Sequence, residues 1–146
     1  MTAISFLTPE DTAQAFAIEC RSHAFPWREQ TFASNQGDRF LNYRLDADGV
    51  MAAFAITQVV LDEASLFNIA VDPAFQRRGY GRQLLQHLIA ELEKREVMTL
   101  WLEVRASNHP AIALYEQLDF HQVSRRPNYY PTASGREDAI IMALTL

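Results

Sequence analysis

The sequence predicts an α/β domain, or α+β by a stricter usage, built on a central twisted sheet that is mixed and largely antiparallel. The main observation is a strand–turn–helix–strand order over residues 65–104, which predicts a βαβ unit with parallel strands and a right-handed crossover. Strand-like pairs flank this unit on both sides and account for the antiparallel part of the sheet. The chain has 146 residues and no repeat or linker, so we expect one domain over residues 1–146, with helices on both faces of the sheet.

The first helix is predicted from its start signal. Residues 8–11, TPED, are typical of a helix start, with a threonine cap followed by proline and two acids. Apolar residues then recur at helical spacing and predict one buried face, made of Ala13, Phe16, Ala17 and Cys20. Cys20 is therefore expected to pack in the core, and a nucleophilic role is the weaker interpretation.

The later elements follow from helical periods and from runs of β-branched and aromatic residues. The helix after the glycine turn is the clearest, because its leucines at 84, 85, 88 and 92 share one face. A turn and a short helix are expected within residues 25–36. We expect strands over residues 40–45, 51–61, 65–71, 99–104, 120–125 and 139–144, and helices over 82–95 and 111–118.

The composition argues against several classes of function. The net charge of −5 and the pI near 5.3 argue against nucleic-acid binding and suit a basic partner. The four histidines have no metal-ligand spacing, so we expect no metal. No apolar run reaches the roughly 18 residues of a membrane span, and the start lacks the regions of a secretory signal. With a single cysteine and no internal disulfide, the chain is expected to be cytoplasmic.

A glycine turn, FQRRGYGRQL, precedes the leucine-rich helix. A helix start presents unpaired amides and a partial positive charge, so it attracts anions, and the arginines of the turn add charge. A Walker A loop would need Lys-Ser/Thr after Gly81, where the chain has Arg82-Gln83, and a dinucleotide fingerprint would need glycine at Leu84. Taken alone, the turn favours a plain connection that uses glycine to bend, because short motifs of this kind often occur by chance.

The surroundings of this turn resemble the Gcn5-related N-acetyltransferases (GNAT family). Residues 76–81, QRRGYG, are similar to the family's loop for acetyl-CoA, residues 67–73 to the bulged strand before it, and residues 105–115 to its second motif. The resemblance covers nearly the whole chain and implies acetyl-CoA as the acetyl donor. It implies backbone contacts to the pantetheine arm from Ile69, Ala70 and Val71, and pyrophosphate contacts from Arg77, Arg78, Gly79, Tyr80, Gly81 and Arg82.

Glu103 breaks the expected pattern of its strand. Alternation places Leu100, Leu102 and Val104 on one face and Trp101 and Glu103 on the other, although a central parallel strand is normally apolar on both. A polar residue near the carboxyl end of such a strand is typical of a ligand site. The pattern alone does not separate this from a glutamate that reaches solvent. The family resemblance implies that Glu103 is the general base.

Asn108 and Tyr115 are seven residues apart, so they share one helix face. The resemblance implies that both contact coenzyme A and that Tyr115 protonates the departing thiolate. The alternatives are a helix cap for Asn108 and a core aromatic for Tyr115, and these do not exclude the functional roles.

The acceptor is suggested by three segments, whose candidate contact residues are Phe25, Trp27, Tyr129, Tyr130 and Glu137. Tyr129 and Tyr130 are expected in the connection between the last two strands. Together these segments resemble the branch of the family that acetylates protein N-termini, and within it the bacterial enzymes acting on the N-terminal alanine of small-subunit ribosomal protein eighteen. The implied partner is a basic protein N-terminus, with direct transfer in a ternary complex. For the aromatic residues, packing in the core or in a loop is the alternative.

Two other functions stay open at this point. One is acetylation of a small amine or a lysine, and the other is a non-catalytic module that binds acetyl-CoA. Having Glu103, Asn108 and Tyr115 all present argues against the second.

The chain departs from the family at two turns, where Glu96 and Asp119 stand in place of common glycines. If either backbone is left-handed, we expect a cost of about 1–2 kcal/mol relative to glycine.

Overall fold

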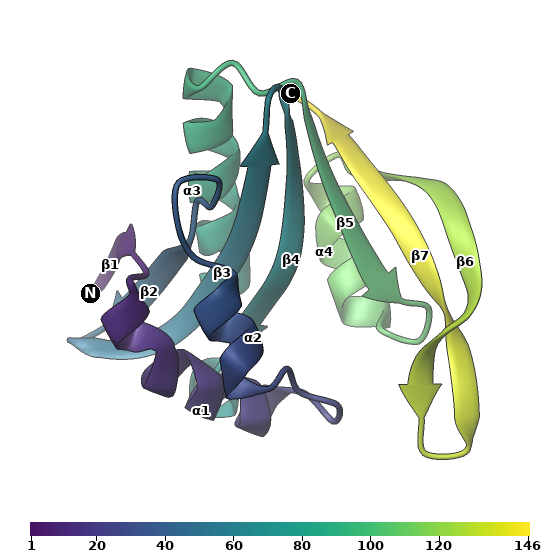
Figure 1. The fold of residues 1–146 in the computed structure, drawn as a ribbon, viewed down its shortest axis with the longest axis horizontal. Coiled ribbons are helices and arrows are strands. Elements are labelled where there is room, and N and C mark those ends of the chain that lie inside the picture. The colour runs from purple at the N-terminus through teal and green to yellow at the C-terminus, as the bar shows by residue number, and fades with distance from the viewer.

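The computed structural model describes residues 1–146 and contains a single sheet of seven strands in the order β1-β2-β3-β4-β5-β7-β6 (Figure 1). Only β4 and β5 run parallel, and every other neighbouring pair is antiparallel. The predicted mixed, largely antiparallel sheet with one βαβ unit is thus confirmed. The strands are β1 (Thr2–Phe6), β2 (Tyr43–Ala47), β3 (Val50–Val60), β4 (Glu63–Val71), β5 (Thr99–Arg105), β6 (His121–Thr132) and β7 (Gly135–Thr145).

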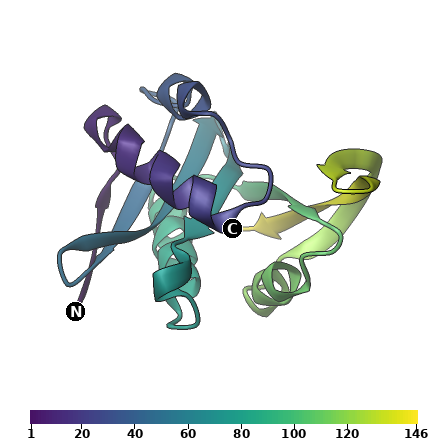
Figure 2. The same cartoon turned by 90° about the horizontal axis from the view of Figure 1, so that it is seen from below.

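Helices cover both faces of the sheet, as predicted. Figure 2 shows α1 and α2 on one face and α3 and α4 on the other. No helix is long and apolar enough to cross a membrane. The helices are α1 (Thr12–Ser22), α2 (Glu29–Ser34), α3 (Tyr80–Lys94) and α4 (His109–Gln117), with short 3₁₀ turns at Pro9–Asp11 and Pro73–Phe75.

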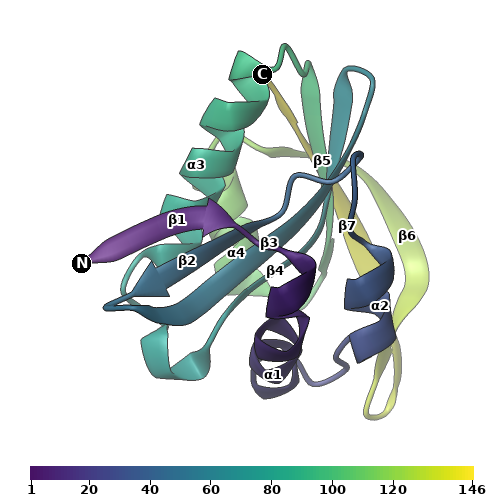
Figure 3. The same ribbon diagram turned by 60° about the vertical axis from the view of Figure 1, so that its left-hand side comes forward.

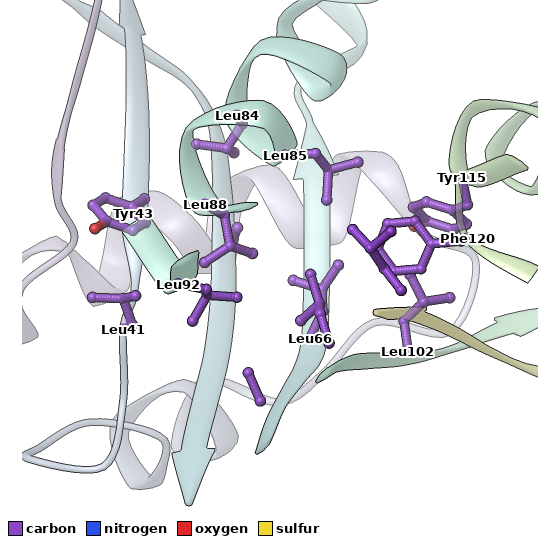
Figure 4. Close-up of a cluster of buried hydrophobic side chains, with 14 of the residues drawn as sticks. Leu41, Tyr43, Leu66, Leu84, Leu85, Leu88, Leu92, Leu102, Tyr115 and Phe120 are labelled. Carbon is purple, nitrogen blue, oxygen red and sulfur yellow. The ribbon is translucent and has the colours of Figure 1, made fainter. Parts of the chain in front are cut away.

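The two faces carry separate hydrophobic cores because β3 is apolar on both sides. Phe54 and Ile56 face α1 and α2, whereas Ala53 and Ala55 lie in the larger core under α3. The four leucines of α3 that the sequence predicts as one face are wholly buried there (Figure 4). Small residues on the strand and large ones on the helix fill the layer between them at the density of a protein interior.

The strand boundaries differ from the prediction in three places. β1 was not expected, and it lies at one edge of the sheet, opposite β6 at the other edge (Figure 3). The strand expected over 40–45 begins at Tyr43 and ends at Ala47. The last two strands form a hairpin far longer than expected, so Tyr129 and Tyr130 lie within β6 and not in a connection. Their largely exposed sequence has no alternating apolar pattern, and of the two only Tyr130 has a partner in β7, Glu137.

The predicted face of α1 is wrong. The buried residues are Ala15, Ile18 and Glu19, and Cys20 is exposed. The pattern failed because the helix buries a carboxylate, so the stripe of apolar residues does not mark the side that packs.

The parallel strands β4 and β5 separate before they end, which positions the site. They pair over only four residues each, from Glu63 with Thr99 to Leu66 with Leu102. Beyond that point β4 continues along β3 and β5 continues along β7. The register of β4 against β3 shifts at this point, which leaves Phe67 as the extra residue of a bulge, and bulges bend a strand. Figure 1 shows the two strands diverging toward their carboxyl ends.

Both turns that lack the family's glycine are left-handed. Glu96 has φ 61° and Asp119 has φ 73°. Each is the left-handed residue of a Schellman motif that ends a helix, because Val97 donates to the carbonyl of Leu92 and Phe120 to that of Tyr115. The second motif therefore fixes Tyr115 and Phe120 against each other.

We expect Glu96→Gly to raise the free energy of unfolding by about 0.5–1 kcal/mol, because relief of left-handed strain exceeds the added chain entropy of glycine. Urea unfolding measures this. Glu93→Gly is the matched control: Glu93 lies exposed inside α3, so the same substitution should lower stability by about 1 kcal/mol. Equal losses in both variants would contradict the strain at Glu96.

Candidate active site

A cavity of about 420 Å³ lies where β4 and β5 separate, and we call it the central cavity. It brings together residues from α1 and the loop after it, from the end of β4, from β5, from α4 and from β6. Of the residues predicted for the site, it is lined by Phe25, Trp27, Ile69, Glu103, Asn108, Tyr115 and Tyr130. Residues up to 105 positions apart in the sequence thus meet at one point, as the prediction required.

Glu103 lies on the face of β5 that the alternation predicts, with Leu102 and Val104 buried on the other side. Its Oε1 is 3.3 Å from Nη2 of Arg126, and both side chains are partly exposed. Glu103 and Tyr130 also line a second, outer cavity of about 590 Å³, which includes Tyr129. The carboxylate therefore lines two cavities that share lining residues, and it lies close to a positive charge and to solvent.

Tyr115, in contrast to Glu103, is buried. It is 6% exposed, packs on Phe120 at 5.6 Å between ring centroids, and belongs to the large core as well as to the central cavity (Figure 4). Burial raises the pKa of Tyr115 to about 12, and the nearby Tyr130 adds to the shift. The phenol thus keeps its proton at any neutral pH. It is both a core aromatic and a hydroxyl donor at the cavity.

Asn108 caps α4, because its Oδ1 accepts a hydrogen bond from the amide of Ala111 at 3.3 Å. The cap that the sequence offered as an alternative is therefore present. The side-chain NH₂ group makes no hydrogen bond within the chain, so it is free to donate into the central cavity.

Two aromatic residues on opposite sides of the cavity are joined by Arg105, which the sequence reading missed. Its guanidinium lies 5.1 Å from the ring centre of Phe25 and 4.6 Å from that of Tyr130, within the range of cation–π attraction. It also donates to the carbonyl of Pro131 at 2.7 Å. Arg105 thus links the loop after α1 to the β6–β7 hairpin.

The remaining acceptor candidates divide into two groups. Trp27 packs edge-on against Phe32 at 5.1 Å and also lines both cavities, so packing and exposure to the site coexist. Tyr129 lines only the outer cavity. Glu137 lines neither, and its carboxylate accepts hydrogen bonds from the Ser107 hydroxyl at 2.8 and 3.0 Å.

The end of β4 presents free amides to the opening. In an antiparallel pair the hydrogen-bonded residues alternate, and the amide of Asp72 donates to Ala52 of β3. The amide of Ala70 therefore also points toward β3, whereas those of Ile69 and Val71 point toward β5. Because β5 has separated here, these two amides are available to a ligand that lies between the strands.

The glycine turn forms a second set of free donors at the start of α3. No amide from Arg77 to Arg82 donates a hydrogen bond within the chain. Arg77 and Gly79 have φ of 66° and 78°, and left-handed residues in such turns make concave anion-binding surfaces. The guanidinium of Arg78 stacks on Phe75, and Arg82 donates to Gln117. The donor set suits a polyanion such as a pyrophosphate.

Three further residues that line the central cavity were not predicted from the sequence as site residues: Glu19, His23 and Asn68. Glu19 lay outside the predicted apolar face of α1, so its burial was not expected. The one available signal was that Glu19 is the only acid within α1.

The fold and the site together define an acyltransferase, with backbone donors for a long anionic donor molecule and an acid and a carboxylate where the strands open. A sequence model of the Acetyltransferase (GNAT) family matches residues 6–120, and the chain belongs to that family. The predicted family and enzyme class are thereby confirmed.

Comparisons with individual proteins agree with this family assignment. The chain is 68% identical over 146 residues to the [ribosomal protein bS18]-alanine N-acetyltransferase of Escherichia coli K12, covering 100% of this chain and 99% of that one. The crystal structure of the ribosomal-protein-S18-alanine N-acetyltransferase from Escherichia coli superposes with a TM-score of 0.98, covering 99% of this chain and 94% of that one at 68% identity. Arabidopsis thaliana NAA60 in complex with acetyl-CoA has the same fold, with a TM-score of 0.87 at 17% identity and coverage of 100% and 99%.

The two glycines of the turn should respond differently to alanine. Gly79 is left-handed, so Gly79→Ala should lower the free energy of unfolding by about 1 kcal/mol and raise KM for acetyl-CoA about tenfold. At Gly81 an added Cβ meets Val71 at 3.6 Å, an ordinary contact. Gly81→Ala should therefore keep stability and KM close to those of the parent. Urea unfolding and initial rates measure both, and an equal loss at the two positions would refute the distinction.

Proposed function

We propose that the chain is an N-terminal protein acetyltransferase, which moves acetyl from acetyl-CoA to the α-amine of the N-terminal alanine of small-subunit ribosomal protein eighteen. The observation that carries the proposal is the 68% identity over the full length to a relative named for this reaction. The central cavity supports it, because a chain terminus can enter between the loop after α1 and the β6–β7 hairpin. We place the reaction in the cytoplasm, where such a protein is made.

The donor is held by backbone groups. Acetyl-CoA supplies the acetyl group as an activated thioester. We assign its pantetheine arm to the free amides of β4 at Ile69 and Val71, and its pyrophosphate to the turn from Arg77 to Arg82. One amide of β4 would also stabilise negative charge on the carbonyl oxygen during transfer. Asn108 would add a side-chain donor from the start of α4.

Glu103 is assigned as the base. An α-amine has a pKa of about 7.7–8.0, so much of it is protonated at neutral pH and must lose a proton to attack. A lysine at about 10.4 would need about 3.5 kcal/mol more for the same loss. A carboxylate such as Glu103, whose side chain is 31% exposed, can accept this proton directly or through one water, and it suits the α-amine better than a lysine. Arg126, at 3.3 Å from Glu103, is the cation whose place the protonated amine would take.

Tyr115 is assigned as the acid. Its raised pKa keeps the hydroxyl protonated until the sulfur departs, and its burial excludes water from that side of the cavity. The transfer from phenol to thiolate is uphill for isolated groups, and the raised pKa of Tyr115 makes it more so; it therefore depends on the thiolate being enclosed as well, which raises the pKa of the thiol, and on the hydroxyl being held close to the sulfur. The Schellman motif that joins Tyr115 to Phe120 holds it in this way.

The overall charge supports a basic acceptor. The net charge of −5 attracts a cationic chain end over distances of about one Debye length, roughly 8–10 Å at physiological salt. Direct binding to nucleic acid is not part of the proposal.

Mass spectrometry of a basic peptide with an N-terminal alanine, incubated with enzyme and acetyl-CoA, tests the acceptor. We expect one acetyl group on the α-amine and none on lysine. Polyamines and a peptide blocked at its N-terminus but carrying lysines are the competing acceptors. Acetylation of those alone would favour the small-amine or lysine alternative, and binding of acetyl-CoA without any turnover would favour a non-catalytic module.

Glu103→Gln and Tyr115→Phe should each lower kcat about 100-fold or more, since each removes a proton-transfer group. Both changes preserve shape, so the dissociation constant of acetyl-CoA should change less than twofold to threefold. Steady-state rates and calorimetric titration separate the two effects. Near-parental kcat in either variant would remove that residue from the assignment.

A further inference from the structure

Glu19 is the most deeply buried carboxylate of the molecule, and the mechanism above does not use it. It is 2% exposed, lies on α1, and lines the central cavity. Burial of a carboxylate is unfavourable unless its oxygens accept hydrogen bonds, and both oxygens of Glu19 do so.

The contacts of Glu19 join two segments that border the cavity. Its Oε2 accepts from the amide of Trp27 at 2.9 Å, and its Oε1 accepts from Nδ2 of Asn68 at 2.8 Å. Trp27 belongs to the loop after α1, and Asn68 follows the bulge of β4. His23, in the same loop, places Nε2 3.4 Å from Oε1 of Glu19. One side chain thus fixes both the loop and the strand against each other.

Attachment of α1 to the sheet does not require this carboxylate. Ala15 and Ile18 already pack in the core of that face, and Arg21 pairs with Asp72 at 2.6 Å. No lysine or arginine pairs with Glu19, and a buried charge of this kind is a poor source of stability. What Glu19 adds is the position of groups that line the cavity.

We infer that Glu19 is a positioning residue for the acceptor: it holds the loop with Phe25 and Trp27 at the distance from β4 that the acceptor chain end requires. This rests on the proposed function, because the cavity is taken as the acceptor site. Acetyl-CoA is assigned to the amides of Ile69 and Val71 and to the turn before α3, none of which hydrogen-bonds to Glu19, so the main effect of Glu19 is expected on the acceptor.

The kinetic test uses Glu19→Gln, which keeps the shape but turns an acceptor oxygen into a donor that faces another donor. The KM for the alanine peptide should rise about tenfold or more, because small displacements of a positioning loop have large effects, while the KM for acetyl-CoA changes less than twofold. Asn68→Ala removes one of the two bonds and should give a smaller rise of the same kind.

Two controls separate the inferred role of Glu19 from the effect of losing a negative charge and from the effect of loosening α1. Glu29→Gln removes the same charge from an exposed position on α2, and should leave the peptide KM within twofold if charge alone is unimportant. Arg21→Gln removes the neighbouring link between α1 and β4, and should not reproduce the selective rise in peptide KM.

A fluorescence measurement tests the inference without turnover. The chain has two tryptophans, so Trp101→Phe leaves Trp27 as the reporter. In that background Glu19→Gln should increase acrylamide quenching of Trp27 about twofold, as a loosened loop opens locally. If the parent enzyme fails to acetylate the peptide, the proposed function fails, and the quenching result still stands on its own.

Unchanged quenching in both Glu19→Gln and Asn68→Ala, or an equal rise in KM for both substrates, would overturn the inference. If Glu19→Gln does not fold, Asn68→Ala decides by the same two readouts.

Discussion

The separation of β4 and β5 is the constraint on which the rest of the site depends. If the two strands stayed paired beyond Leu66 and Leu102, the amides of Ile69 and Val71 would be used in the sheet. The cavity beside Glu103 would then be closed by the neighbouring strand. Because the ladder stops after four residue pairs, the backbone itself supplies donors and the strand ends leave a cavity between them. Ligands in α/β sheets commonly bind beyond the carboxyl ends of strands for this reason.

The separated strands are held apart by packing from both faces. On the α1 face, Ser22 donates to the carbonyl of Val71 and Arg21 pairs with Asp72, so the end of β4 is attached to α1. On the other face, Tyr115 and Phe120 pack in the same core as the leucines at the point of separation (Figure 4). The opening is therefore a packed feature of the fold, and the hydroxyl of Tyr115 reaches it as a consequence of that packing.

The sequence predicted the elements with strong local signals. The α3 leucines, the parallel pair, the glycine turn and the alternation at Glu103 all follow from periodicity or from residues whose backbone preference is marked. It failed where long-range contacts decide. β1 is held mainly by pairing with β2, the extension of β6 by pairing with β7, and the face of α1 by a buried acid with partners 8 and 49 residues away. Arg105 was missed because its role depends on two rings brought together only by the fold.

The two residues that we propose for proton transfer lie in different environments. Tyr115 is enclosed, with a pKa raised to about 12, so it arrives protonated. Glu103 is partly exposed beside Arg126, and an ion pair so exposed to water contributes little stability, so an incoming amine can replace the guanidinium at small cost. The arginine that pairs with Glu103 also stacks on Tyr129, at 5.2 Å from its ring centre, so it has a second partner when displaced. In the proposed mechanism, entry of the acceptor and exposure of Glu103 are thereby linked through one side chain of β6.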